Sequence, residues 1–121
     1  MNLQNKSEIN YDNRFFRSIN NSASGEVSSE TVFHYRQKGA IVWATYEGGA
    51  IKFGTLIARV LESGGLEMRY SHVNQNGELM TGECRSTPEV LPDGRIRLRE
   101  KWQWTSGDLS VGESVIEEVS N

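Results

Sequence analysis

The chain has 121 residues, enough for one domain with one modest core, and its formal net charge is −3. Acidic and basic residues are interspersed, which argues against a nucleic-acid partner because such a partner requires a concentrated basic face. No stretch approaches the roughly 18 apolar residues of a membrane-spanning helix, so no membrane association is expected. Cys84 is the single cysteine. It excludes an intrachain disulfide and favours a reducing compartment, the cytoplasm.

Residues 1–12 are polar and Asn-rich, without the charged start and apolar run of a signal peptide, and we expect a flexible N-terminal tail there. Residues 13–121 are the predicted barrel domain. In it, runs rich in Val, Ile, Thr and aromatic residues alternate with short Gly-bearing turns, which is typical of an antiparallel meander. The predicted strands are 14–20, 28–36, 40–47, 50–61, 65–74, 78–91, 95–106 and 109–119. About eight strands with short connections predict an all-β, up-and-down barrel, whose closure removes the edge strands.

The turns also predict the pairing register, because turn length and residue type decide which residues of two strands face each other. Loops of three residues are expected at 92–94, 75–77 and 62–64, each ending in Gly. The resulting pairs are Ser86 with Glu100, Cys84 with Trp102, Gly82 with Trp104, His72 with Met80, Tyr70 with Gly82, Leu56 with Tyr70, and Arg59 with Glu67 on the outer face.

Two further turns extend this register toward the N-terminus. A two-residue turn at 48–49 would pair Trp43 with Gly54, and a loop at 37–39 would pair Phe33 with Trp43. A glycine would then face a tryptophan twice, at Trp43 and at Trp104, as expected if indole rings cross the interior. The register of the last strand is left open.

The predicted interior is aromatic and apolar, with few polar members. An eight-stranded barrel is just wide enough either to be filled by side chains or to hold one small ligand, so both a solid core and a pocket remain possible. The expected lining is Phe33, Tyr35, Ile41, Trp43, Leu56, Ala58, Val60, Leu66, Met68, Tyr70, His72, Met80, Cys84, Ile96, Leu98, Glu100, Trp102 and Trp104.

Polar residues gather near one end of the predicted barrel, above aromatic walls, as at the mouth of a ligand pocket. The same pattern would arise if these residues were polar only because they lie at the end of the barrel, in contact with water. The candidate ligand-binding residues are Trp43, Lys52, Tyr70, His72, Asn74, Glu78 and Trp104. Glu100 is predicted as a buried acid beside Ser86.

No catalytic residues are predicted. Glu100 and His72 could form an acid–base pair, but the register separates them by six residues along a strand, roughly 20 Å at 3.4 Å per residue. The two histidines and one cysteine lack the spacing of a metal site. No Gly-rich loop precedes a helix, so no cofactor is expected.

The register also places apolar residues on the outer face. They would form an apolar patch that must be shielded from water, either by another part of the chain or by a second copy of it. The candidate homodimer patch comprises Val42, Tyr46, Ile51, Phe53, Val73 and Leu79.

Most of the chain after residue 12 resembles a family of small bacterial proteins described as N-acetylglutamate synthase. The resemblance lies in FRSINNSASGEVSSETVFHYRQKG, VWATYEGGAIKFGTLI, MRYSHVNQNGELMTGECRSTPEVLPDGRIRLREKWQWTSGD and GESVIEE. It implies acetyl transfer from acetyl-CoA to glutamate, without catalytic residues that match positions here, and a shape similar to the lipocalin-related (calycin-like) small barrels.

Three functions therefore remain. The favoured prediction is non-catalytic binding of a small, partly apolar molecule at one barrel end. The alternatives are an acyltransferase of the kind that the resemblance implies, and a structural barrel that assembles with itself.

Overall fold

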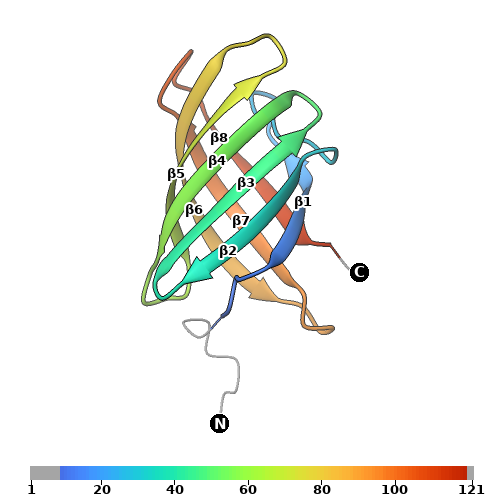
Figure 1. The fold of residues 1–121 in the computed structure, drawn as a ribbon, viewed down its shortest axis with the longest axis vertical. Helices are drawn as coiled ribbons and strands as arrows, with labels where there is room; N and C mark the ends of the chain where they lie inside the picture. Colours follow the sequence, from blue (N-terminus) through green and yellow to red (C-terminus); the bar gives the residue numbers. More distant parts are fainter. Residues whose placement is uncertain (1–8, 120–121) are drawn as a thin grey trace.

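The chain folds into a closed barrel of eight antiparallel strands, described for residues 9–119 in a computed structural model (Figure 1). The strands are β1 (Arg14–Asn21), β2 (Val32–Lys38), β3 (Ile41–Gly48), β4 (Ile51–Val60), β5 (Leu66–Asn74), β6 (Leu79–Val90), β7 (Ile96–Trp104) and β8 (Val111–Glu118). Each strand pairs with its neighbours in sequence, and β8 pairs with β1. The predicted all-β, up-and-down barrel is confirmed. Within residues 9–119, no helix is long and apolar enough to cross a membrane.

The connections define two ends of the barrel. The lower end in Figure 1 carries the β2–β3, β4–β5 and β6–β7 turns. The upper end carries the β3–β4, β5–β6 and β7–β8 turns, together with residues 22–31, which join β1 to β2. We call residues 22–31 the cap segment. The sequence predicted a strand from residue 28, whereas β2 begins at Val32.

The predicted register is confirmed from β4 to β7. Ser86 faces Glu100, and His72 faces Met80. Outside the barrel, the Arg59 Nε donates to a Glu67 oxygen across β4 and β5 at 2.9 Å. The turns that predicted these pairs end at Gly64, Gly77 and Gly94, which all have positive φ, as expected for left-handed loop positions.

The predicted register of β3 is wrong, and its side chains lie on the opposite faces. Lys38 pairs with Ile41, so the β2–β3 turn has two residues rather than three. At the other end of β3, the pairing shifts at a bulge between Tyr46 and Gly48. Because side chains alternate, these small differences exchange the inner and outer sets. Trp43 therefore faces out, with 38% of its surface exposed, and Tyr46 faces in.

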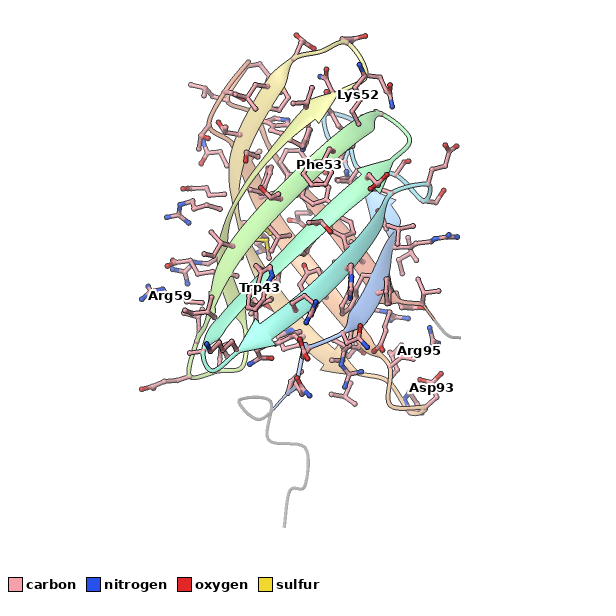
Figure 2. All side chains as sticks on the ribbon, in the orientation of Figure 1. Trp43, Lys52, Phe53, Arg59, Asp93 and Arg95 are labelled. Carbon is pink, nitrogen blue, oxygen red and sulfur yellow. The ribbon has the colours of Figure 1, made fainter. Side chains whose placement is uncertain are left out.

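This exchange removes the predicted homodimer patch. Val42, Tyr46 and Ile51 belong to the buried core. Phe53 and Leu79 do lie outside, and Figure 2 shows Phe53 with Trp43 on the outer face of the β3–β4 hairpin. The continuous surface that the sequence predicted does not exist, because half of its members point into the barrel. Ile41, predicted inside, is exposed like Trp43.

The lower half of the interior is a dense apolar core. Its fully buried members include Phe16, Tyr35, Leu66, Ile96, Leu98 and Ile116. Tyr11 closes this end from below, because its ring packs against Tyr35 and its hydroxyl donates to the Gly64 carbonyl at 2.8 Å. Tyr11 belongs to the N-terminal tail that the sequence predicted. Residues 1–8 of that tail lie outside the described residues.

Candidate functional site

The upper half of the barrel contains a small cavity of about 50 Å³. A volume of this size holds one or a few water molecules, whereas ligand pockets usually measure about 300–1,000 Å³. Its lining comes from all eight strands and from the cap segment, and consists of Asn21, Gly25, Glu26, Val27, Phe33, Tyr46, Leu56, Met68, Tyr70, His72, Cys84, Glu100, Trp102, Trp104 and Ser114.

Three of the aromatic side chains that line the cavity pack over glycines of the neighbouring strand. In each upper hairpin, an aromatic residue faces a glycine on the next strand, and the pairs are Tyr46 with Gly54, Tyr70 with Gly82, and Trp102 with Gly112. A Cβ on any of these glycines would collide with the aromatic ring. The missing side chains therefore let the rings lie against the barrel wall, which leaves the centre open.

A carboxyl group forms the floor of the cavity. Glu100 accepts hydrogen bonds from the hydroxyls of Ser86 and Ser114, each at 3.0 Å. Burial raises the pKa of Glu100 to about 7, although the two serine hydrogen bonds lower it in part. The predicted pairing of Glu100 with Ser86 is confirmed. Ser114 was not predicted, because the sequence does not define the register of β8.

The cap segment covers the cavity from above. It forms no strand, and Gly25, Glu26 and Val27 reach into the mouth of the barrel. It is fixed near its ends, where Ser22 N donates to the Glu113 carbonyl at 3.0 Å and the Thr31 hydroxyl donates to the Gly48 carbonyl at 3.1 Å. Val27 packs against the core from the centre of the segment.

Side-chain donors of the barrel hold the centre of the cap segment. The His72 Nε2 lies 2.7 Å from one Glu26 oxygen, and the Asn74 Nδ2 lies 2.9 Å from the other. The Trp104 Nε1 donates to the Ser24 carbonyl at 3.1 Å. Both His72 and Asn74 are buried, so the acidic side chain of Glu26 reaches donors that have little access to water.

The structure brings some of the predicted site residues together and separates others. Tyr70, His72 and Trp104 line one cavity, and the His72 and Trp104 rings meet nearly at right angles with centroids 5.7 Å apart. Asn74 lies at the rim, where its Nδ2 also donates to Glu78 at 2.9 Å. All five belong to the upper end of the barrel.

Trp43 and Lys52 do not belong to this group. Trp43 faces solvent because of the shifted register of β3, and Lys52 is exposed near the β3–β4 turn, outside the cavity (Figure 2). Tyr46 takes the interior place that the sequence assigned to Trp43. Its hydroxyl lies 3.0 Å from the His72 Nδ1.

Glu26 was the principal residue that sequence reasoning missed. It lies between Gly25 and Val27 in a Ser-rich stretch before the predicted strand at residue 28, so nothing local marked it as an interior group. Its contacts are to β5, 46 and 48 residues further along the chain. Only the three-dimensional path of the cap segment shows them.

Glu100 and His72 line the same cavity, although the confirmed register places their rows six residues apart along the strands. Strands in a small barrel are tilted by about 35–45°, so a row of paired residues runs obliquely around the barrel, and residues of different rows on different strands can line one cavity. The two groups form no hydrogen bond with each other, since each is held by other partners. No acid–base pair is assembled between them.

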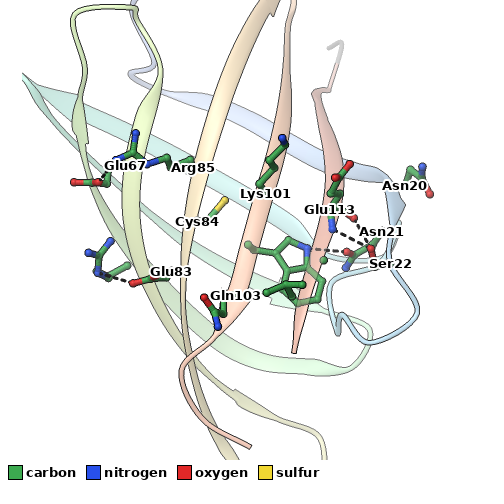
Figure 3. Close-up of a pocket in the computed structure, with 14 residues that line it drawn as sticks. Asn20, Asn21, Ser22, Glu67, Glu83, Cys84, Arg85, Lys101, Gln103 and Glu113 are labelled. Carbon is green, nitrogen blue, oxygen red and sulfur yellow. Dashed lines mark hydrogen bonds and ion pairs between the residues drawn. The ribbon is translucent and has the colours of Figure 1, made fainter. Parts of the chain in front are cut away.

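A second hollow lies outside the barrel, over β5 to β8 (Figure 3). It is broad and open, with a volume of about 890 Å³. Its charged side chains neutralise one another in part, for example Arg85 with Glu67 at 2.7 Å and Arg69 with Glu83 at 3.6 Å. Because this surface is open and its charges are paired in part, we place the candidate site inside the barrel.

Metal and thiol chemistry find no support at these positions. Within the described part of the chain, no cluster of three or more His, Cys, Asp or Glu side chains is arranged to hold a metal ion. Burial raises the pKa of the Cys84 thiol well above its usual range, so the group stays protonated and is a poor nucleophile. Its polar neighbour is Ser86, at 3.8 Å.

Together, the fold and the site define a small antiparallel barrel with an aromatic-walled interior cavity beneath a capped end. Residues 9–119 match the family described as avidin-like protein, and the chain belongs to that family. No curated protein matches the sequence. The match and the closed barrel agree with the predicted likeness to calycin-like small barrels. They do not extend to the N-acetylglutamate synthase description.

Proposed function

We propose that this protein is a non-catalytic barrel that binds a small, partly apolar molecule at its upper end. The observation that carries the proposal is the aromatic-walled cavity, which lies between the Glu100 carboxyl group and the cap segment. A ligand there would stack on Tyr70 and Trp104 and place a polar group near Glu100. Membership of the avidin-like family supports a binding barrel over an enzyme.

Binding requires the cap segment to move. The cavity of about 50 Å³ is too small for an organic ligand, and Gly25, Glu26 and Val27 of the cap segment line it. Outward displacement of these residues would enlarge the cavity, while the eight strands keep their pairing.

The composition of the cap segment is suited to such a movement. It is rich in Ser and contains Gly25, and its central contacts are mainly hydrogen bonds that a polar ligand can replace. Val27 is its apolar anchor. Segments with few buried apolar contacts open at lower free-energy cost than core strands.

The acyltransferase alternative gains nothing from this geometry. Glu100 is held by two serines, His72 is held by Tyr46 and Glu26, and the Cys84 thiol stays protonated. No nucleophile among these groups is paired with a base in the manner that covalent or general-base catalysis requires.

Tryptophan fluorescence tests the proposal, because Trp102 and Trp104 line the cavity whereas Trp43 lies outside. We expect the Trp43→Phe variant to respond to a bound compound as the wild type does, and the Trp104→Phe variant to lose much of the response. Biotin heads the panel because of the family, followed by small aromatic acids, amides and amines. Absence of any response across such a panel would contradict the proposal.

A further inference from the structure

The Glu26 carboxylate lies in a recess of hydrogen-bond donors at the mouth of the barrel. His72 contributes its Nε2 at 2.7 Å to one oxygen, and Asn74 contributes its Nδ2 at 2.9 Å to the other. The two donors come from alternate positions of β5, so they point to the same side of the strand. The two oxygens of one carboxylate thus meet one donor each. We call His72 and Asn74 together the carboxylate recess.

Neighbouring groups fix the orientation of both donors. The Tyr46 hydroxyl lies 3.0 Å from the His72 Nδ1, so it can donate to that nitrogen while Nε2 carries a proton toward Glu26. The Asn74 Oδ1 accepts from the backbone N–H groups of Asn76 and Glu78, at 3.0 and 2.9 Å. These bonds turn the amide nitrogen of Asn74 toward the carboxylates of Glu26 and Glu78. The recess is therefore preorganised and does not depend on the cap segment for its shape.

Two indole N–H groups also donate hydrogen bonds at the mouth, one to the cap segment and one to the last residue of β1. The Trp104 Nε1 donates to the Ser24 carbonyl, and the Trp102 Nε1 donates to the Asn21 Oδ1, both at 3.1 Å. Displacement of the cap segment would leave the buried donors of His72 and Trp104 without these partners, at a cost of about 1–3 kcal/mol for each. A ligand recovers this free energy only if it brings acceptors of its own.

We propose that the ligand carries a carboxylate, which replaces that of Glu26 in the carboxylate recess. Glu26 then acts as an internal competitor that occupies the recess when no ligand is bound. This inference rests on the proposed function and specifies its ligand class, a small monocarboxylic acid with a flat apolar body. The exchange replaces one anion by another in the recess, so it adds no charge beside Glu78.

The body of such a ligand would extend downward from the recess. Trp104 contacts both His72 and Tyr70 edge to face, with ring centroids 5.7 and 5.8 Å apart. An aromatic or aliphatic body attached to the carboxylate would enter between these rings once Val27 has left. The direction from recess to floor leads toward Glu100, which would meet a donor group on longer ligands.

Isothermal titration calorimetry with phenylacetate and phenylacetamide tests the inference, because the two compounds differ only in the group that would enter the recess. In the Glu26→Ala variant, we expect phenylacetate to bind at least tenfold more tightly than to the wild type. Phenylacetamide should change less than twofold. Glu30→Ala is the matched control, since Glu30 is an exposed acid of the same segment, and its affinities should equal those of the wild type.

A second variant tests the recess itself. Asn74→Asp has nearly the same shape but replaces the donor by an acceptor, so in the Glu26→Ala background it should abolish the gain for phenylacetate. Equal gains for both compounds, or no gain for either while both bind, would overturn the carboxylate assignment and leave the proposed function intact. If neither compound nor any member of the fluorescence panel binds the wild type or the variants, both proposals fail.

Discussion

The two ends of the barrel are closed by different chemistry. At the lower end, the buried Tyr11 ring packs against an apolar core and its hydroxyl donates one hydrogen bond, to the Gly64 carbonyl. At the upper end, Glu26 and Ser24 of the cap segment occupy polar donors above a cavity. Apolar burial stabilises the fold directly, whereas polar closure can be exchanged for a ligand that supplies its own hydrogen-bond acceptors. The lower closure therefore serves stability, and the upper closure can serve binding.

The largest effect should follow from removing the lower closure. We expect Tyr11→Ala to lower the free energy of unfolding by about 3–5 kcal/mol, as for other large aromatic residues removed from cores. Tyr11→Phe keeps the ring and should cost only about 1 kcal/mol for the lost hydrogen bond. Urea denaturation measures both. A loss below about 1 kcal/mol for Tyr11→Ala would remove the distinction between the two ends.

Glu100, on the floor of the cavity, marks the boundary between the halves. Because its pKa is about 7 in the folded protein and 4.5 for an ordinary glutamate, the folded protein binds more protons than the unfolded chain between these values. Stability should therefore fall as pH rises from about 4.5 to about 7, by on the order of 3 kcal/mol. Glu100→Gln should remove this dependence and be more stable than the wild type at about pH 8. If the free energies of unfolding of the wild type and of Glu100→Gln changed with pH in parallel, the raised pKa of Glu100 would be contradicted.

Closure at the upper end should contribute less to stability. Val27 is the partly buried apolar residue of the cap segment, and Val27→Ala should lower the free energy of unfolding by about 1 kcal/mol. The same variant should speed amide hydrogen exchange in the cap segment while leaving the strands protected. A loss as large as that of Tyr11→Ala would show that the cap segment belongs to the core.

The smallest effect is expected outside both ends. Trp43→Thr changes an exposed residue paired with Ile57, and its free energy of unfolding should stay within about 0.5 kcal/mol of the wild type. Tyr46→Thr, at an interior position of the same strand, should cost several times more. If Trp43→Thr lowered the free energy of unfolding more than Tyr46→Thr, the register that the sequence predicted for β3 would be supported instead.

Sequence reasoning succeeded where turns are unambiguous. The loops at 62–64, 75–77 and 92–94 end in glycines with positive φ and fixed the register from β4 to β7, including Ser86 opposite Glu100. It failed around β3, where consecutive glycines at 48 and 49 and the sequence Lys38-Gly39-Ala40 allow several turns that differ by one residue. Such a slip exchanged Trp43 with Tyr46.

Part of the site could not be predicted for a different reason. Tyr70, His72 and Trp104 were placed correctly at one end because strand register determines which residues share a face and a level. The place of Glu26 depends on how an irregular segment crosses the mouth, and no periodicity describes that path. Ser114 was missed because its strand lacked a readable turn.

The indole N–H resonances in an NMR spectrum report whether a ligand binds at the upper end of the barrel. Three tryptophans give three signals, and the N–H groups of Trp102 and Trp104 bond to Asn21 and the cap segment, whereas Trp43 lies outside. On titration with a binding compound such as phenylacetate, we expect the Trp102 and Trp104 signals to shift and the Trp43 signal to stay in place. A shift confined to Trp43, or no shift at saturating ligand, would contradict binding at the upper end.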